Sequence, residues 1–187
     1  MKLYIARHGQ TDDNLNGVFS GWRNTPLNST GFEQAKKLSE QLKDAKFEVA
    51  YQSDQLRAQQ TLNAILKFHP GVKIITDKRI RERNYGNLNG RKHDDVLAEF
   101  GREQYDTWHR SYDIPPPDGE SVEMVEHRTI PFCNELVQKM RKEKVNVLVS
   151  CHHNSMRTMR RFFENLTAGQ MMKLENLPGS YVEYDIK

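Results

Sequence analysis

Short apolar runs alternate with longer stretches of mixed polar and apolar residues along the chain. Apolar runs rich in β-branched side chains are typical of buried strands. They predict strands over residues 2–6, 49–51, 72–75, 145–149 and 181–186. The mixed stretches predict helices over residues 30–43, 54–68, 94–108, 121–142 and 155–163. The pattern therefore predicts an alternation of strands and helices.

Local signals indicate where the helices begin and where the chain is irregular. Thr30-Gly31-Phe32-Glu33 has the capping-box pattern, so the first helix is expected to start there. The second helix is expected to begin at a cap formed by Ser53 or Asp54. Residues 9–29 and 80–92 are rich in glycine and asparagine and are predicted to be irregular.

Alternating strands and helices favour a three-layer α/β sandwich, with a mostly parallel central sheet and helices on both of its faces. A chain of 187 residues can bury one hydrophobic core, and we expect a single domain over residues 1–187. Parallel sheets bind ligands beyond the carboxyl ends of their strands. This edge of the sheet, the rim, is where functional residues are expected.

The composition narrows the class of protein. Hydrophobic residues make up 36% and charged residues 28%, and no stretch has the length of a membrane span. The apolar N-terminal run is interrupted at Arg7, too early for a signal peptide. Cys133 and Cys151 are predicted to be reduced thiols. We therefore expect a cytoplasmic protein without a membrane partner.

The charge indicates what kind of partner to expect. The net charge is only +3 and no long basic run is present, so nucleic acid is not an expected partner. A cationic pocket on a mildly positive protein attracts small anions. We predict a small phosphorylated substrate, and both a monomer and a homodimer stay open.

Chemically versatile side chains follow several of the predicted strands. Arg7-His8-Gly9 follows the first strand, and His152-His153-Asn154 follows the fourth. Arg57 lies near the start of the helix after the second strand, and Glu82 lies in the irregular segment after the third. Since parallel strands place their carboxyl ends on one edge, these side chains are expected to converge at the rim.

This set of residues matches the needs of phosphoryl transfer. An imidazole can attack phosphorus as a covalent nucleophile, and arginines bind phosphate oxygens in pairs. A second histidine can stabilise the charge of the transferred group. A carboxyl group can protonate the leaving oxygen, provided that burial raises its pKa. The residues thus predict a phosphohistidine enzyme.

Other interpretations of the same residues stay open. A histidine after a strand is often structural, Arg57 could form a surface ion pair, and Glu82 could be solvated. Adjacent His152 and His153 point apart on an extended backbone and lack a ligand partner at helical spacing, so we expect no metal site. A catalytic pair of Cys151 and His152 is disfavoured, because sequence neighbours rarely face each other.

Two motifs carry a resemblance to a known family. Residues 3–14, around Arg7-His8-Gly9, resemble the signature of the histidine phosphatase superfamily, and residues 53–61 resemble its second motif. Within it, the chain is most similar to the short form of cofactor-dependent phosphoglycerate mutase. That likeness covers nearly the whole chain and includes residues 19–22, 81–90, 108–117, 119–121 and 152–157.

The resemblance implies a phosphoglycerate mutase-like fold and a role for each matching residue. His8 would be the phosphorylated nucleophile and Glu82 the acid and base, while Arg7, Arg57 and His152 would bind the transferred group. The substrate site would include Thr11, Asn14, Ser20, Gly21, Tyr85, Arg110 and Asn154. The reaction implied is the interconversion of 2- and 3-phosphoglycerate, primed by 2,3-bisphosphoglycerate and without a metal.

Several positions depart from the pattern of these mutases. His109 replaces the first of two adjacent arginines, and His153 replaces a glycine. A lysine normally stands near His93, and Lys92, one place away, is expected to substitute for it in the substrate site. If His109 and His153 ionise near neutrality, substrate binding should weaken as the pH rises.

These departures bear on the reaction. The chain ends directly after the last strand, without the tail that covers the site in larger mutases, and water can then compete for the phosphoryl group. A weaker cationic wall and access of water both favour an alternative, a metal-independent phosphatase acting on small phosphomonoesters. A second alternative is an anion-binding module without catalysis.

Overall fold

The computed structural model describes all 187 residues. Five strands form one sheet in the order β3-β2-β4-β1-β5. Their bounds are β1 (Lys2–Arg7), β2 (Val49–Gln52), β3 (Lys73–Thr76), β4 (Val147–Cys151) and β5 (Tyr181–Asp185). Neighbouring strands are parallel except β5, which runs antiparallel to β1. The predicted, mostly parallel sheet is confirmed, with each strand within about two residues of its expected bounds.

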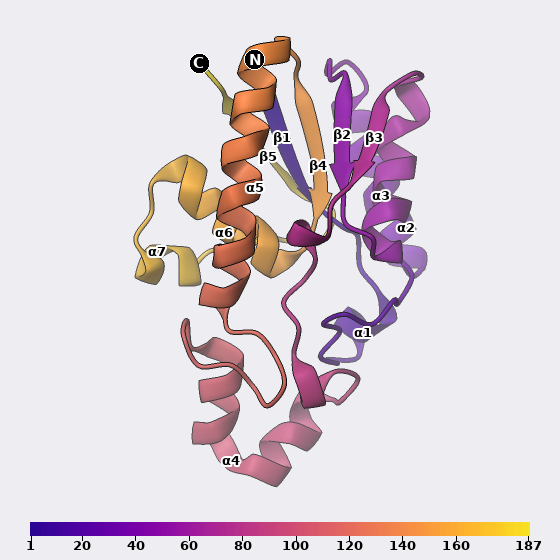
Figure 1. Cartoon of the computed structure of the whole chain (residues 1–187). Coiled ribbons are helices and arrows are strands. Elements are labelled where there is room, and N and C mark those ends of the chain that lie inside the picture. The colour runs from indigo at the N-terminus through magenta and orange to yellow at the C-terminus, as the bar shows by residue number, and fades with distance from the viewer.

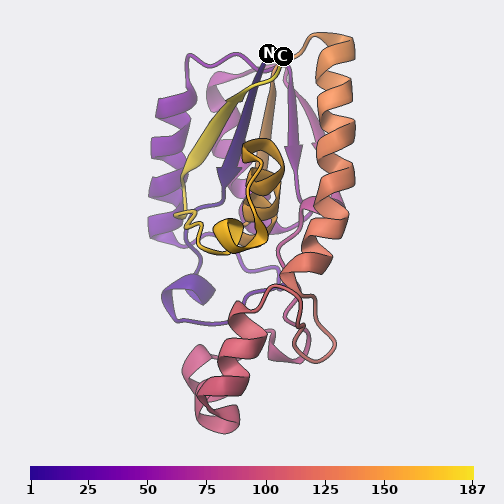
Figure 2. The same ribbon diagram turned by 90° about the vertical axis from the view of Figure 1, so that its left-hand side faces the viewer.

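Helices cover both faces of this sheet (Figure 1). The helices are α1 (Asp12–Leu15), α2 (Ser29–Leu42), α3 (Leu56–Ile65), α4 (His93–Arg110), α5 (Val122–Glu143), α6 (His153–Glu164) and α7 (Ala168–Met172). Short 3-10 turns lie at Leu66–Phe68, Lys78–Ile80 and Gly86–Leu88. The pair α2 and α3 packs on one face, and α5 and α6 pack on the other (Figure 2). The predicted three layers are therefore present.

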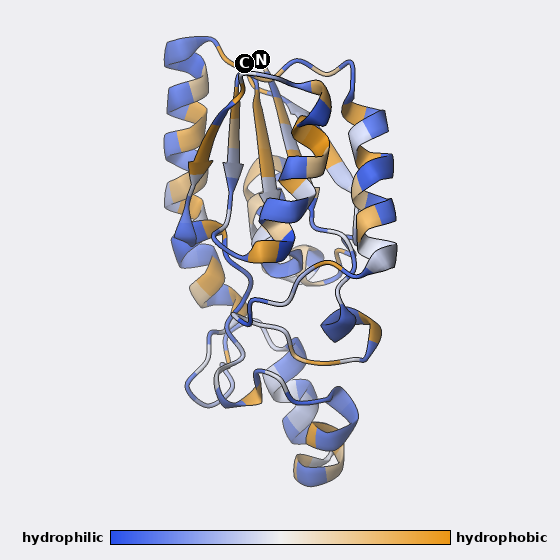
Figure 3. Ribbon diagram, turned by 90° about the vertical axis from the view of Figure 1, so that its right-hand side faces the viewer, coloured by the Kyte–Doolittle hydropathy of each residue, from blue (hydrophilic) through white to orange (hydrophobic).

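The alternation of side chains along β1 explains the two cores. Leu3 and Ile5 join the apolar cluster that includes residues of α5 and α6, and Tyr4 and Ala6 join the cluster formed with α2 and α3. Successive side chains of a strand point to opposite faces, so one strand contributes to both layers. In Figure 3, apolar residues gather on the strands and on the helix faces that cover them.

Helix α4 lies apart from the sandwich, beyond the carboxyl ends of the strands (Figure 1). It packs around a small cluster of Phe19, Leu88, Val96 and Tyr105. Gly101 interrupts it with φ 79° and ψ 167°, a conformation that glycine adopts at little cost. Both chain termini lie at the opposite end of the molecule (Figure 2). Residues of α4 and of the rim line the cavities described below.

Some helix starts differ from the prediction. Asn28, rather than Thr30, caps α2, because its side chain accepts a hydrogen bond from the Gly31 N–H at 2.9 Å. Neither Ser53 nor Asp54 caps α3, whose first flanking residue is Gln55. Ser53 pairs with His152 instead, and Asp54 accepts from Arg81 Nε at 2.6 Å. A helix start can do without a side-chain cap when its N–H groups bond elsewhere.

Two short helices, α1 and α7, lie in stretches that were expected to be irregular or were left unassigned. Thr11 and Thr167 cap them through capping boxes. Helices of four and five residues are too short to show a hydrophobic period, which explains the omission. No helix combines the length and the apolar character that crossing a membrane requires.

Candidate active site

Two buried histidines stand side by side at the rim. His8 follows β1 and His152 follows β4, and these strands pair in parallel with Arg7 opposite Cys151. The register therefore brings the two imidazole rings to 5.0 Å between centroids. His8 is 2% exposed and His152 is fully buried. The convergence expected from the strand pattern is present.

The hydrogen bonds of His8 determine which ring nitrogen carries the proton. Its Nδ1 lies 2.6 Å from the carbonyl oxygen of Gly9, and its Nε2 lies 3.2 Å from the Nε of Arg57. A carbonyl can only accept and a guanidinium can only donate. Nδ1 is therefore the protonated nitrogen, and Nε2 presents a lone pair. Burial, with help from Arg57 and Arg7, holds the pKa of His8 well below its usual value, so the ring is neutral.

Arg57 is held in place by backbone carbonyls. It is 1% exposed and donates to the carbonyl oxygens of Arg23 at 2.8 Å and Gly21 at 2.9 Å. Burial lowers its pKa to about 10, which still leaves the guanidinium charged at neutral pH. A fixed positive charge thus lies against the lone pair of His8.

Arg7 and His152 have buried polar atoms that make no hydrogen bond within the chain, the Nε of Arg7 and the Nδ1 of His152. Arg7 donates through Nη1 to the carbonyl of Asn176, and the Nε2 of His152 lies 2.7 Å from Ser53 Oγ. Ser20 Oγ is also buried without a partner. Since buried polar atoms are nearly always paired, unpaired ones around His8 point to an anion-binding site.

Glu82 is held by backbone N–H groups. Its Oε1 accepts from Arg83 at 2.7 Å and Asn154 at 3.1 Å, and its Oε2 accepts from His153 at 3.1 Å. Burial favours the neutral acid, but His153, the Arg83 N–H and the charge of Arg57 outweigh it, so the pKa of Glu82 is lowered. The carboxylate also lies at the N-terminus of α6, where N–H groups stabilise its charge, so the condition that burial raise its pKa is not met in the free protein.

Two adjoining cavities lie between the rim and α4. The inner cavity has a volume of about 240 Å³ and the outer one about 670 Å³. Both are lined by Arg7, Tyr85, His109, His153 and Asn154. The inner cavity also contacts Asn14, Ser20, Gly21, Glu82 and His93, and the outer one also contacts Arg110, Arg157, Lys173 and other residues up to Leu177. Most of the predicted substrate residues therefore share one space.

Two predicted substrate residues do not reach either cavity. Thr11 is buried, and its Oγ1 accepts from the Asn14 N–H at 3.2 Å as the cap of α1. Lys92 is exposed at the start of α4, and its neighbour His93 lines the inner cavity instead. The helix begins at His93, and the direction in which it starts places the side chain of His93, and not that of Lys92, toward the cavity.

Three histidines at the departing positions form part of the cavity wall. Burial lowers the pKa of His109 to about 3 and that of His153 to about 4, and it also lowers the pKa of His93. His93 stacks on Phe19 with 4.0 Å between ring centroids, and its Nδ1 lies 2.8 Å from the Tyr105 hydroxyl. The wall that these three histidines form is therefore uncharged at neutral pH, so the condition that His109 and His153 ionise near neutrality is not met in the free protein.

Sequence reasoning missed several residues of the outer cavity. Arg157 lies one helical turn after His153, and its Nη2 is 2.7 Å from the His153 ring and donates to the carbonyl of Leu174 at 3.0 Å. The spacing of four residues between His153 and Arg157 could have predicted that both side chains lie on the same face of the helix. Lys173 and the rest of segment 172–177 had none, because only tertiary packing brings them there. No cluster of three or more His, Cys, Asp or Glu side chains suits a metal ion.

Known proteins are similar to this chain in sequence and in fold. The profile of the histidine phosphatase superfamily (branch 1) matches residues 3–187. The chain belongs to the histidine phosphatase superfamily. The 2,3-bisphosphoglycerate-dependent phosphoglycerate mutase of Brucella ovis is 40% identical over 186 residues, which cover 97% of this chain and 90% of that one. The superfamily resemblance drawn from the motifs is confirmed.

Solved structures that are similar to this member of the histidine phosphatase superfamily include phosphatases. A mycobacterial glucosyl-3-phosphoglycerate phosphatase complexed with VO3 is 25% identical with a TM-score of 0.86, covering 97% of this chain and 90% of that one. The alpha-ribazole phosphatase of Shigella flexneri is 26% identical with a TM-score of 0.88, covering 100% and 91%. The chain is therefore similar in sequence to named mutases and in structure to named phosphatases, all of them enzymes.

Proposed function

We propose that the chain transfers phosphoryl groups through a phosphohistidine on His8, and that it interconverts 2- and 3-phosphoglycerate. The observation that carries this proposal is the neutral His8 ring, whose Nε2 lone pair lies beside Arg57 among unpaired buried donors. A neutral imidazole with a fixed lone pair is a nucleophile, and fixed donors stabilise the charge of a phosphoryl group.

In the first step, His8 Nε2 attacks phosphorus and the bond to the ester oxygen breaks. Arg7 and Arg57 donate to the phosphoryl oxygens. Ser53 Oγ accepts the Gln55 N–H at 3.3 Å and lies 2.7 Å from His152 Nε2, and we assign its O–H as the donor to this nitrogen. His152 then carries its proton on Nδ1, its unpaired nitrogen, and donates it to the phosphoryl group. The Gly9 carbonyl stabilises the phosphorylated ring through Nδ1–H.

Glu82 supplies and removes the proton. It is ionised in the free protein, because its pKa is lowered. A phosphate dianion arriving beside it raises that pKa by repulsion between like charges, so the carboxylate takes up a proton as substrate binds. It gives this proton to the leaving oxygen, and it accepts one from the hydroxyl that attacks phospho-His8 in the return step.

The cationic outer cavity favours the mutase reaction. Arg110, Arg157 and Lys173 line it together with Arg7. A bisphosphate can place one phosphate at His8 and the other among these cations. The 40% identity to bisphosphoglycerate-dependent mutases over 97% of the chain supports 2,3-bisphosphoglycerate as the primer. The proposed reaction uses no metal.

The uncharged wall favours a second candidate, a phosphatase of small phosphomonoesters. His93, His109 and His153 are neutral, so they bind a substrate carboxylate less strongly than lysine or arginine. A weakly bound phosphoglycerate leaves phospho-His8 before it takes back the phosphoryl group, and water then takes that group and releases inorganic phosphate. The named phosphatases of the same fold support this reaction.

One assay separates these reactions. The protein is given 3-phosphoglycerate and catalytic 2,3-bisphosphoglycerate, and both 2-phosphoglycerate and inorganic phosphate are followed. A mutase interconverts the isomers much faster than phosphate appears, whereas dominant phosphate release would establish the phosphatase. Incubation with labelled bisphosphoglycerate should leave acid-labile phosphate on the protein. Absence of label would support the anion-binding module, and loss of activity in chelator would contradict the metal-free mechanism.

The cellular setting of the reaction stays a prediction. The buried, unpaired Cys133 and Cys151 fit a reducing compartment, which supports the cytoplasm. A small phosphorylated substrate is the proposed partner, and both monomer and homodimer are compatible with a site built from one chain. Sedimentation of the purified protein would decide between the two assemblies.

A further inference from the structure

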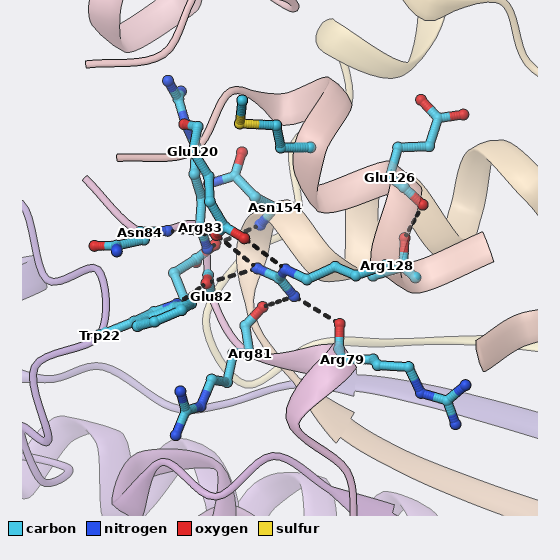
Figure 4. Close-up of polar contacts among 12 residues, drawn as sticks. Trp22, Arg79, Arg81, Glu82, Arg83, Asn84, Glu120, Glu126, Arg128 and Asn154 are labelled. Carbon is cyan, nitrogen blue, oxygen red and sulfur yellow. Dashed lines mark hydrogen bonds and ion pairs between the residues drawn. The ribbon is translucent and has the colours of Figure 1, made fainter. Parts of the chain in front are cut away.

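The segment that carries Glu82 has no place in the sheet or in a long helix, so its backbone needs other partners. Arg128, on α5, supplies them (Figure 4). Its Nη1 donates to the carbonyl oxygens of Arg79 at 2.6 Å and Arg81 at 2.9 Å, and its Nη2 donates to that of Glu82 at 2.9 Å. One guanidinium thus binds three carbonyls of this irregular stretch.

Glu120 fixes this guanidinium from the other side. Its Oε1 accepts from Arg128 Nε at 2.9 Å, and its Oε2 accepts from Nη2 at 3.0 Å. The same Oε2 accepts the N–H of Asn84 at 2.8 Å, two residues beyond Glu82. The pair Arg128 and Glu120, the clamp, therefore holds the chain on both sides of Glu82 (Figure 4).

The clamp leaves the Glu82 backbone little freedom. The Glu82 carbonyl accepts a second hydrogen bond, from Trp22 Nε1 at 2.8 Å. Arg83 donates to the carbonyls of Glu120 at 2.6 Å and Trp108 at 2.7 Å. The side chains of Arg128 and Glu120 are each 17% exposed, so water competes little for the hydrogen bonds of the clamp. Neither residue is among those that line the two cavities.

We propose that Arg128 and Glu120 are positioning residues for the acid, holding the Glu82 carboxyl group within reach of the leaving oxygen. This inference rests on the proposed role of Glu82. Proton transfer needs donor and acceptor within hydrogen-bonding distance, and a misplacement of about 1 Å costs about 10²-fold in rate. Arginine suits this place because its planar group donates in several fixed directions, which lysine does not.

Leaving-group dependence tests the proposal. An alkyl phosphate such as glycerol phosphate needs a proton from Glu82, whereas p-nitrophenyl phosphate expels a stable anion unaided. kcat/KM reports the steps up to departure of the leaving group. We expect Arg128→Gln to lower kcat/KM about tenfold to a hundredfold on glycerol phosphate. The loss on p-nitrophenyl phosphate should stay within about threefold, and Glu82→Gln should show the same selectivity more strongly.

Control variants separate positioning from folding. Arg161→Gln is the matched control, because Arg161 is likewise paired with a carboxylate, that of Glu126. It also donates to the Tyr112 hydroxyl, and neither partner belongs to the Glu82 segment. This variant should leave the ratio of the two substrates at the wild-type value. Arg128→Lys keeps the charge and part of the donor set, so it should recover part of the loss. If Arg128→Gln fails to melt cooperatively, Glu120→Gln decides, with the same selective loss expected.

Each outcome decides between the two proposals. Equal losses on both esters, or no loss on either, would overturn the positioning role. Phosphate label on wild-type His8 with an unchanged ratio in Arg128→Gln would overturn this inference alone. A wild type that takes no label and cleaves neither ester would overturn the proposed function, and the role of the clamp with it.

Discussion

The two halves of the site are built differently. The half around His8 and His152 lies directly at the ends of buried parallel strands, so sheet register sets its geometry. The half that carries Glu82 and His109 lies on an irregular segment and on α4, and side-chain bonds to backbone carbonyls hold it. The sheet therefore fixes the two adjacent histidines, whereas side-chain hydrogen bonds hold the proposed acid, Glu82, and part of the substrate cavity.

The largest expected effect is the loss of the nucleophile. His8→Ala removes the only nitrogen placed to form the phosphohistidine, and activity should fall at least about 10³-fold. The measurement is kcat/KM together with acid-labile phosphate on the protein. His127→Ala, at an exposed histidine of α5, is the matched control and should keep both. Equal labelling of His8→Ala and wild type would contradict the covalent step.

Removal of the fixed charge beside His8 should have the next largest effect. Arg57→Gln withdraws donors from the phosphoryl group, and kcat should fall about 10²-fold to 10³-fold. Because the Arg57 charge helps to lower the pKa of His8, the same variant should raise that pKa toward its usual value. An NMR titration of the His8 ring measures this shift. An unchanged His8 pKa would contradict the electrostatic coupling, whatever happens to the rate.

The buried histidines predict a dependence of stability on pH. Their pKa values are lower in the folded protein than the value of about 6.5 in an unfolded chain. The unfolded chain therefore binds more protons below pH 6.5, and the free energy of unfolding should fall as pH falls, by up to about 1.4 kcal/mol per pH unit for each histidine. Urea titrations at pH 7 and pH 5 measure this slope.

His109→Gln should reduce that slope, because it removes one lowered pKa from the substrate half of the site. His127→Gln, at an exposed position of α5, is the control for the replacement of a histidine by glutamine. A slope that His109→Gln leaves at the wild-type value would contradict the neutral state of His109 in the folded protein.

A smaller effect is expected from the hydrogen bond that orients His152. Ser53→Ala leaves His152 Nε2 without its partner at 2.7 Å, so the ring loses the preference that places a proton on Nδ1. A single hydrogen bond of this kind corresponds to a loss of about threefold to tenfold in kcat. Ser53→Thr keeps the hydroxyl and should recover part of the rate. Equal rates in Ser53→Ala and wild type would contradict the tautomer proposed for His152.

The smallest expected effect sharpens the contrast between the halves. His109→Arg places a permanent charge on the uncharged wall, and KM for 3-phosphoglycerate should fall about twofold to fivefold. The ratio of isomer interconversion to phosphate release should rise, because the bisphosphate then stays longer. p-Nitrophenyl phosphate, which lacks a carboxylate, provides the control and should keep its KM. A lower KM for both substrates would indicate a general change of the cavity instead.

Individual residues show how much of the site could be predicted from the sequence. Residues around His8, Arg57 and His152 could be assigned to the rim because each follows a strand with a clear apolar signal. Lys92 and His93 show the limit, since both stand at the start of α4 and only the path of the helix turns His93 inward. The lowered pKa of Glu82 was also beyond reach, because its causes, His153, the Arg83 N–H and the charge of Arg57, outweigh burial only where the folded chain brings these groups together.

The sequence by itself determined the order of the strands and longer helices along the chain, the superfamily and the candidate residues at the rim, because periodicity and motifs are local properties of the chain. Only the tertiary structure decided that β1 lies beside β4, that segment 172–177 closes the outer cavity, and that Arg128 holds the backbone of Glu82. These features depend on contacts between distant residues, and on burial that shifts each pKa. Neither can be read from the order of residues alone.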